Sequence, residues 1–311
     1  MPLTVCEKRR GGHTPQEKNR RENKRMDIKW HEGVGPHMKI NETKGVTYLT
    51  FPALEGIPGI LHGFSTRLGG VSRGIYSSMN LSFTRGDEEE SVRENFRRIS
   101  GALGFLPEDI VASSQTHTAN VRVMTEADKG NGVTRPGIYE DVDGMITNVP
   151  GVVLATFYAD CVPLYFVDPV RKAVGLSHSG WRGTVGKIGA ETVKKMGEVY
   201  GSRPEDIYGA IGPSICQECY EVSEDVILEF QKVFEEKDWK NLYYRKENGK
   251  YQLDLWEANR RIMEIAGLLP EHISLPGICT CCNPEFLFSH RASKGKRGNL
   301  GAFLGITEER K

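Results

Sequence analysis

The chain has 311 residues, of which 38% are apolar and 26% are charged, the proportions of a globular protein long enough to bury a full hydrophobic core. Its 41 basic residues equal its 41 acidic residues, so no overall field attracts nucleic acid or an anionic membrane. Apolar stretches such as 151–158 are far shorter than the roughly 20 residues that span a bilayer. These properties exclude a transmembrane protein and predict neither a nucleic-acid nor a membrane partner.

The first 37 residues differ in character from the rest of the chain. They are rich in Lys, Arg, Glu and Asn and have few large apolar side chains, which predicts a disordered extension over 1–37 followed by a single catalytic domain over 38–311. A solvated tail, an arm that binds nucleic acid, or an N-terminus lengthened upstream of Met26 or Met38 would share this composition. Because no apolar segment follows the basic residues, we expect no secretory leader, a cytoplasmic location, and cysteines present as reduced thiols or ligands.

The ordered pattern begins with strands expected over 46–51 and 60–65, separated by Gly and Pro. A glycine-rich loop follows over 67–80. The acidic run 87–90 then opens a helix that we expect to end at Gly101. The apolar face of this helix is formed by Val92, Phe96 and Ile99.

The middle of the chain is rich in expected strands. Their apolar residues form continuous runs rather than alternating with polar ones, which indicates sheets covered on both faces. The expected strands cover 110–114, 119–124, 151–158, 163–167 and 173–178.

The last third mixes helices and short strands. An apolar stripe predicts a helix over 185–200, followed by a strand over 207–211. Helices are also expected over 223–235 and 254–266, the second with Asp254 as its N-cap. Strands and helices that do not alternate strictly favour the α+β class, with layers of mixed sheet and helix. The remaining short strands are expected near Ile273 and Phe286.

Three potential metal ligands stand where apolar strands turn polar: His117, Cys161 and His178. Two imidazoles and one thiolate match a catalytic zinc site, which leaves a fourth position open. Their spacing in the sequence does not by itself indicate a metal site. The same residues could be a buried cysteine with two hydrogen-bonded histidines, or a Cys161 nucleophile activated by His178, with Asp160 or His117 orienting the base.

Several segments resemble the bacterial YfiH/YlmD-type family, in matching order over residues 45–306. The family was first described as copper-dependent polyphenol oxidases, or laccases, and is now understood as zinc-dependent purine nucleoside phosphorylases. The similar segments are Gly-Gly-Val-Ser-Arg-Gly-Ile-Tyr-Ser-Ser-Met-Asn-Leu, Gln-Thr-His, Tyr-Ala-Asp-Cys-Val-Pro-Leu, His-Ser-Gly-Trp-Arg-Gly-Thr, Ile-Gly-Pro-Ser-Ile with Cys-Tyr-Glu-Val, and Ile-Cys-Thr with Phe-Ser-His-Arg.

The resemblance implies a layered α/β/β/α domain that splits adenosine, inosine and methylthioadenosine with phosphate, together with a companion adenosine deaminase activity. It assigns the metal, Zn²⁺ with Cu²⁺ as the other possibility, to His117, Cys161 and His178. The protein would then be a transferase whose partners are a purine nucleoside and phosphate. The preferred purine and the oligomeric state stay open.

Residue chemistry suggests roles around that metal. Phosphate needs cationic groups, and a planar guanidinium grips its oxygens in pairs, helped by backbone donors in the turn at 69–70. A carboxylate could shuttle protons or, equally, orient an imidazole. The candidates are Arg67, Arg182 and Arg291 for phosphate, Asp160 for the carboxylate, and Asn80, Tyr76 and Trp181 for sugar or base. Trp181 could instead belong to the core, and Asp143 could equally form a turn.

The remaining cysteines suggest a second metal site. Four thiolates from Cys216, Cys219, Cys279, Cys281 and Cys282 could hold a structural zinc, or these thiols could be redox-sensitive. Cys216, Cys281 and Cys282 lie outside the pattern of the family.

Three rival functions remain. A Cys-His amidase acting on peptidoglycan precursors would need no metal. A copper oxidoreductase acting on phenols would need more copper centres than eight histidines readily supply. A non-catalytic interaction module would scatter these polar motifs over the surface instead of gathering them around one cleft.

Overall fold

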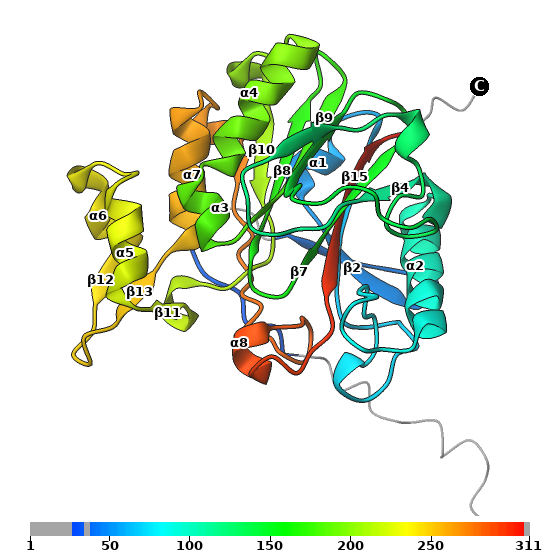
Figure 1. Ribbon diagram of the computed structural model, residues 1–311, viewed down its shortest axis with the longest axis horizontal. Helices are drawn as coiled ribbons and strands as arrows, with labels where there is room; N and C mark the ends of the chain where they lie inside the picture. The colour runs from blue at the N-terminus through cyan, green and yellow to red at the C-terminus, as the bar shows by residue number, and fades with distance from the viewer. Residues whose placement is uncertain (1–26, 34–37, 308–311) are drawn as a thin grey trace, which may run out of the picture.

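Two six-stranded sheets lie face to face at the centre of the fold, and helices cover the outer face of each (Figure 1). The computed structural model describes residues 27–33 and 38–307. Within these residues, no helix combines the length and the apolar character needed to cross a membrane.

The first sheet has the strand order β1-β2-β3-β15-β7-β4. It is mixed, because β4 runs parallel to β7 whereas the other neighbours are antiparallel. Strand β15 lies at its centre, where Ala302 pairs with Phe64 on one side and with Thr156 on the other. The strands are β1 (Lys39–Thr43), β2 (Val46–Thr50), β3 (Ile60–Ser65), β4 (Ile110–Ala112), β7 (Val153–Tyr158) and β15 (Leu300–Ile306).

The second sheet has the order β14-β10-β8-β9-β6-β5 and is also mixed. Its longest ladder joins β8 to β9, from Val162 opposite Ser179 to Asp168 opposite Ala173. The edge strands β14 and β5 run parallel to their neighbours. The strands are β5 (Val121–Val123), β6 (Gly144–Thr147), β8 (Val162–Asp168), β9 (Ala173–Ser179), β10 (Tyr208–Ile211) and β14 (Ile273–Ser274).

The main helices form two outer layers. Helix α2 covers the first sheet, and α3, α4 and α7 lie on the side of the second (Figure 1). The α-helices are α1 (Pro52–Glu55), α2 (Glu89–Leu103), α3 (Trp181–Val185), α4 (Ile188–Tyr200), α5 (Glu224–Gln231), α6 (Glu236–Leu242), α7 (Leu255–Ile265) and α8 (His290–Ser293). Short 3-10 helices cover Gly74–Tyr76, Pro107–Asp109, Glu126–Asp128, Pro204–Asp206, Gln217–Cys219 and Pro270–His272.

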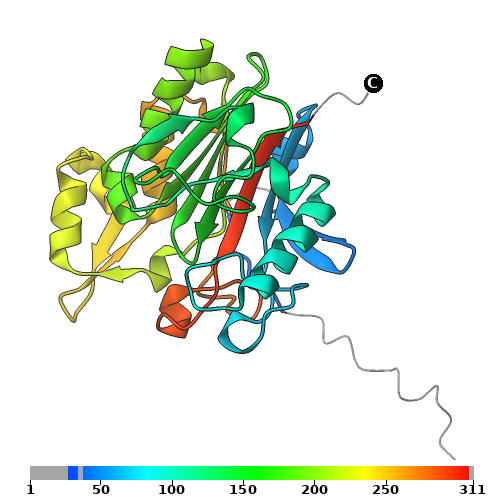
Figure 2. The same cartoon turned by 45° about the vertical axis from the view of Figure 1, so that its right-hand side comes forward.

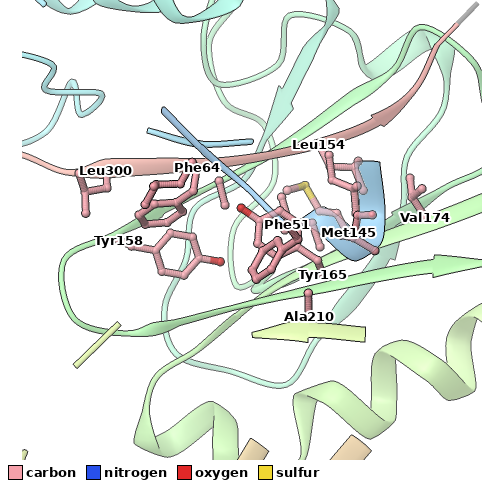
Figure 3. Close-up of a cluster of buried hydrophobic side chains, with 14 of the residues drawn as sticks. Phe51, Phe64, Met145, Leu154, Tyr158, Tyr165, Val174, Ala210 and Leu300 are labelled. Carbon is pink, nitrogen blue, oxygen red and sulfur yellow. The ribbon is translucent and has the colours of Figure 1, made fainter. Parts of the chain in front are cut away.

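Three buried apolar clusters join these layers: one between α2 and the first sheet, one between the sheets, and one between the second sheet and its helices. The cluster between the sheets contains Phe64 and Leu154 from the first sheet and Tyr165 from the second (Figure 3). The Tyr165 hydroxyl donates to the carbonyl of Gly63 at 3.1 Å, so a hydrogen bond also crosses this core. The expected α+β class with layered mixed sheets is confirmed.

A smaller lobe projects beside the second sheet (Figures 1 and 2). It combines α5 and α6 with a three-stranded antiparallel sheet, and its helices contact α3 and α7. The strands of this sheet are β11 (Glu221–Val222), β12 (Tyr243–Arg245) and β13 (Tyr251–Leu253).

Helix α2 extends further than its sequence predicts. The expected end at Gly101 is wrong, because the helix continues to Leu103 and ends at Gly104, which has φ of 93° and whose N–H donates to the Ser100 carbonyl at 2.8 Å. A left-handed residue directly after the last helical turn is the usual position for glycine. The expected cap at Asp254 is confirmed, because its carboxylate accepts from Glu257 N at 2.9 Å.

The helix expected over 185–200 is α4, which begins three residues later than predicted and is preceded by the separate short helix α3. Helix α3 ends at Val185 and α4 begins at Ile188, with Lys187 between them at φ of 55°. The chain turns where Gly186 passes close to Ala119, since a Cβ at Gly186 would lie 3.2 Å from the Ala119 Cβ.

The strand expected near Phe286 is a turn, in which Phe286 N and Leu287 N both donate to the Asn283 carbonyl. The strand that completes the fold is β15, which the sequence analysis does not predict. Its two glycines suggest a loop, but Gly305 passes so close to a neighbouring strand that an added Cβ would lie 2.9 Å from the Val152 oxygen. The close approach of the neighbouring backbone therefore explains why glycine stands at position 305.

Residues 27–33 lie against the body of the fold, and Trp30 forms a β-bridge with Ile278. This segment falls within the stretch 1–37 for which the composition predicts disorder, yet its backbone is paired. The rest of that stretch, 1–26 and 34–37, lies outside the described residues.

Replacing Leu154 by Ala tests the packing between the sheets. Leu154 is 0% exposed, so the substitution should lower the free energy of unfolding by about 2–5 kcal/mol through lost burial and a residual cavity. The same change at Leu228, which is 51% exposed on α5, should cost less than about 1 kcal/mol. Urea unfolding curves of the two variants measure this difference, and equal losses would contradict the packing described here.

Candidate metal centre and substrate cleft

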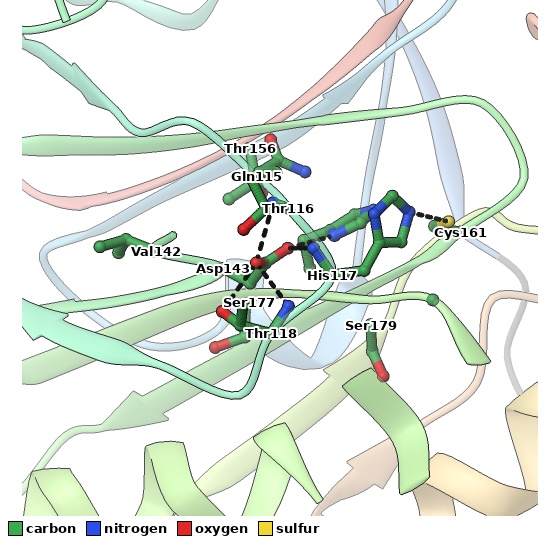
Figure 4. Close-up of polar contacts among 12 residues, drawn as sticks. Gln115, Thr116, His117, Thr118, Val142, Asp143, Thr156, Cys161, Ser177 and Ser179 are labelled. Carbon is green, nitrogen blue, oxygen red and sulfur yellow. Dashed lines mark hydrogen bonds and ion pairs between the residues drawn. The ribbon is translucent and has the colours of Figure 1, made fainter. Parts of the chain in front are cut away.

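His117, Cys161 and His178 converge where the chain crosses from one sheet to the other. Cys161 lies in the connection from β7 to β8, and His117 in the connection from β4 to β5. His178 lies near the end of β9, opposite Pro163. One ligand atom from each residue lies within 4.8 Å of the others, and the Cys161 sulfur is 3.9 Å from the His117 Nε2 (Figure 4).

These distances fit a single ion. A tetrahedral zinc with bonds of about 2.3 Å to sulfur and 2.0 Å to nitrogen separates the two donor atoms by about 3.5 Å. His178 is buried whereas His117 is exposed, so the centre has an open side. Gly180 leaves the space free, because a Cβ there would lie 2.9 Å from the His117 ring and 3.1 Å from the Cys161 sulfur. The arrangement suits an ion with one position open to a reactant.

The buried carboxylate of Asp143 positions both histidines (Figure 4). Its oxygens accept from the backbone N–H groups of Thr116, His117 and Thr118 at 3.1, 3.1 and 2.8 Å. One of these oxygens also lies 2.8 Å from Nδ1 of His178. With Nδ1 engaged in this way, Nε2 of His178 is the ring nitrogen left for a metal, as in other carboxylate-histidine-metal sites.

The electrostatics of the centre favour a thiolate at Cys161. Burial alone would raise the pKa of this thiol, but the charge of His178 and the contact with His117 outweigh burial and lower the pKa to about 6. Burial would lower the pKa of His178, but Cys161 and Asp143 raise it to about 9. A thiolate is the form of cysteine that binds metals.

Asp160, expected to shuttle protons or to orient an imidazole, lies beside the centre with both oxygens engaged. They accept from the Thr280 hydroxyl and from the Arg291 backbone N–H, each at 2.7 Å. The residue has φ of 96°, so the chain bends sharply just before Cys161. These bonds anchor the loop that presents Cys161, and the carboxylate bonded to His178 is Asp143. A catalytic role for Asp160 stays a prediction.

A cleft of about 490 Å³ opens onto the three candidate ligands. Such a volume suits a small-molecule ligand. Its walls combine aromatic rings, one carboxylate and two guanidinium groups, from Phe83, Tyr139, Phe157, Glu140, Arg85 and Arg297.

Arg297 is a cation in an unusual setting. It is only 7% exposed, and its Nε has no hydrogen-bond partner among the described residues. Burial and, to a smaller extent, the neighbouring charge of Arg85 lower the pKa of its guanidinium to about 10. Two guanidinium groups thus lie beside one cleft, and the buried Nε–H of one of them has no partner among the described residues. This arrangement suits an anion.

Arg67, expected to bind phosphate, is not among the residues that line this cleft. Its guanidinium donates to the carbonyl groups of Ser77 and Pro284. Arg67 instead lines a separate hollow of about 220 Å³, which Arg297 also lines.

Arg182 and Arg291 also lie outside the residues that line the cleft. Arg182 is exposed at the start of α3, with its guanidinium 4.4 Å from the ring centre of Trp181. The guanidinium of Arg291 donates to the carbonyl groups of Cys219 and Glu221 at 2.9 and 3.0 Å. These two arginines thus lie outside the lining of the cleft, and a role for either of them in phosphate binding stays a prediction.

Asn80 and Tyr76, expected to contact the substrate, lie directly behind the cleft wall. Asn80 is fully buried, and its Oδ1 accepts from the backbone N–H groups of Ser82 and Asn299. The Tyr76 hydroxyl donates to the Arg85 carbonyl. Ser82, Asn299 and Arg85 line the cleft, so both predicted residues support its wall; direct contact with substrate stays a prediction.

The roles of Asp143 and of the two arginines of the cleft are not evident from the sequence. Asp143 stands in Asp-Val-Asp-Gly, which also suits a turn. Arg85 and Arg297 each precede a glycine in a loop, a weak signal among the many arginines of the chain. Only the folded structure brings these two loops, over two hundred positions apart, to one cleft.

Comparison with known proteins supports the resemblance. A sequence model of the family described as multi-copper polyphenol oxidoreductase laccase matches residues 61–307. Purine nucleoside phosphorylase YlmD of Bacillus subtilis (strain 168) is 39% identical over 250 residues, which cover 80% of this chain and 89% of that protein. Adenosine deaminase RL5 from an unknown prokaryotic organism is 34% identical over 242 residues, which cover 77% of this chain and 90% of that protein.

The fold is shared as well. The crystal structure of YlmD from Geobacillus stearothermophilus superposes with a TM-score of 0.82 at 36% identity, and the match covers 88% of this chain and 100% of that one.

Replacing Gly180 by Ala tests the candidate centre. The backbone there, at φ of −75° and ψ of −179°, accepts an alanine, but the new Cβ would crowd His117 and Cys161. Zinc affinity should fall roughly 10–100-fold, with little change in unfolding free energy. Gly101, where an added Cβ meets nothing within 4 Å, is the matched control and should keep the affinity. Competition with a chromogenic chelator measures both, and an unchanged affinity at Gly180→Ala would contradict this geometry.

Proposed function

We propose that this chain, which belongs to the family described as multi-copper polyphenol oxidoreductase laccase, is a metal-dependent purine nucleoside phosphorylase. One observation carries the proposal: a single cleft contains the His117, Cys161 and His178 cluster together with the guanidinium groups of Arg85 and Arg297. Relatives named purine nucleoside phosphorylase support the reaction class. Adenosine, inosine and methylthioadenosine are the expected substrates.

Phosphorolysis requires that the site bind the phosphate anion and allow the purine base to leave. The bond between the anomeric carbon and the purine nitrogen breaks, a bond from that carbon to a phosphate oxygen forms, and the purine leaves with the electron pair and takes up a proton. The products are the free base and ribose 1-phosphate. Arg85 and Arg297 supply fixed positive charge for the phosphate dianion on the cleft wall.

The aromatic wall of the cleft suits a purine. Phe157 and Tyr139 line it, and the backbone of Phe157 is fixed by Gln115, whose side chain accepts from Phe157 N at 2.7 Å and donates to Phe157 O at 3.0 Å. A rigid ring can stack on a planar base at low entropic cost. Glu140 also lines the cleft and is a carboxylate able to exchange a proton with the purine.

We propose Zn²⁺ as the ion, held by His117, Cys161 and His178, with Cu²⁺ as the alternative that the family description suggests. When bound, the ion supplies Lewis acidity at its open position and could activate water for the companion deamination of adenosine, the activity in the name of one relative. We expect the protein to act in the cytoplasm, where the Cys161 thiol stays reduced.

One observation favours a second candidate function. Cys161, His178 and Asp143 form a thiol-imidazole-carboxylate series like that of a thiol hydrolase, which fits the amidase alternative. Such an enzyme has no use for His117 as a third convergent donor, and its activity would survive removal of metal.

Turnover of inosine separates these functions. The protein should release hypoxanthine and ribose 1-phosphate only when phosphate is present, lose activity after treatment with a chelator, and regain it with Zn²⁺. Cys161→Ser should lower kcat/KM at least about 100-fold through loss of a metal ligand. Free ribose formed without phosphate, restoration by Cu²⁺ alone, or full activity in chelator would each contradict this proposal.

Replacing Arg297 by Gln tests the phosphate site. The variant loses a charged donor, so KM for phosphate should rise about tenfold or more while KM for inosine changes little. Arg203, whose side chain is 64% exposed and paired with Asp206, is the matched control, and Arg203→Gln should leave both constants unchanged. Initial rates at varied phosphate measure the effect, and equal KM values for the Arg297→Gln variant and the unmutated protein would exclude Arg297 from the site.

A further inference from the structure

A second cluster of potential metal ligands lies away from those that line the cleft. It consists of His31, Cys216, Cys279 and Cys282, whose ligand atoms all lie within 4.8 Å of one another. Cys216 and Cys279 are buried, and the other two are partly buried. The cluster therefore offers four donors in a nearly closed setting, unlike the three donors and open side of the cleft.

The geometry of this cluster fits tetrahedral coordination. The sulfurs of Cys216 and Cys282 are 3.9 Å apart, and a tetrahedral zinc with bonds of about 2.3 Å separates two sulfurs by about 3.8 Å. The sulfur of Cys279 accepts backbone N–H bonds from Cys216 at 3.3 Å and from Cys282 at 3.4 Å. N–H donors of this kind stabilise a thiolate, as outer hydrogen bonds do around metal ligands.

Three separate segments supply these donors. Cys279 and Cys282 have the two-residue spacing common in structural zinc sites. Cys216 reaches them because Ser214, two residues earlier, forms a β-bridge with Cys279. None of the three cysteines is close to His31 in sequence.

His31 comes from the N-terminal segment. Its backbone N–H donates to the Gly277 carbonyl at 2.8 Å, next to the bridge between Trp30 and Ile278. Its ring packs edge-on against Trp256, with ring centres 5.2 Å apart. Backbone pairing and an aromatic contact thus fix the imidazole beside the three sulfurs.

We propose that His31, Cys216, Cys279 and Cys282 bind one structural Zn²⁺. Three sulfurs and one nitrogen filling all four positions are typical of structural zinc sites. The expected four thiolates become three thiolates and the imidazole of His31, with Cys219 and Cys281 outside the group of four.

Other occupants explain the cluster less well. A disulfide would use two of the sulfurs. It would not explain why the third sulfur and the His31 imidazole lie beside them. An iron–sulfur cluster places several irons and sulfides between its cysteines, and donors that all lie within 4.8 Å leave room for one ion.

This site would connect the N-terminal segment to the cleft. Thr280, the residue after Cys279, donates to Asp160, and Ile215, the residue before Cys216, donates its N–H to the Asp160 carbonyl at 3.0 Å. Asp160 directly precedes Cys161. A zinc ion here would therefore fix both loops that hold the bend presenting Cys161.

Zinc binding in a Cys161→Ala background tests the proposal, because that change removes a ligand from the centre in the cleft. After treatment with chelator and return of Zn²⁺, this variant should retain roughly one ion per chain by metal analysis. Adding His31→Ala should weaken zinc binding at least about tenfold, since three ligands remain. Cys219→Ser is the matched control, because its sulfur lies 3.5 Å from that of Cys282 but belongs outside the four ligands; it should leave binding unchanged.

Thiol alkylation of the unmutated chain gives a second measurement that needs no substitution. Zn²⁺ should protect Cys216, Cys279 and Cys282 while Cys219 and Cys281 react at the same rate with or without it. Four results would each overturn the proposal: no zinc bound by Cys161→Ala, equal affinity with His31→Ala, weaker binding with Cys219→Ser, or a disulfide at Cys282 in the purified protein.

Discussion

One buried carboxylate, that of Asp143, positions the two histidines of the candidate metal centre. Left without partners, a buried charge would be strongly unfavourable. Here it is matched by three consecutive backbone N–H groups and by the ring of His178, so the loop that bears His117 and the strand that bears His178 can take only one relative position. Cys161 is brought to the two histidines separately, by the bonds from Thr280 and Arg291 that hold Asp160.

The position of the cleft follows from the connections between the two sheets. A residue inside a strand of either sheet faces the core or a helix layer, whereas a residue in a crossing connection lies at the open edge. His117 and Cys161 both occupy such connections, and both connections contain a non-glycine residue with positive φ, His117 itself and Asp160. Each of these two connections thus bends the chain at a residue with left-handed backbone, next to or at a candidate ligand.

The sequence predicts the layers and the candidate ligands well, because both depend on local patterns and on recognisable motifs. It fails where distant segments decide the outcome. Strand β15 contains glycines that suggest a loop, yet it occupies the centre of a sheet. An added Cβ would lie 2.8 Å from the Leu81 side chain at Gly301 and 2.9 Å from the Val152 oxygen at Gly305. Arg297 lies in an ordinary loop sequence, and its importance depends on burial beside Arg85, which no local pattern encodes.

The crossing connections have a mechanical consequence. An ion bound by His117, Cys161 and His178 would cross-link the two sheets. Its ligands belong to the connection from β4, the connection from β7 and the strand β9. Slippage of one sheet over the other would then require a metal bond to break. Catalytic competence and the rigidity of the sandwich would be lost together, so a chain without its ion should show faster amide exchange along that seam.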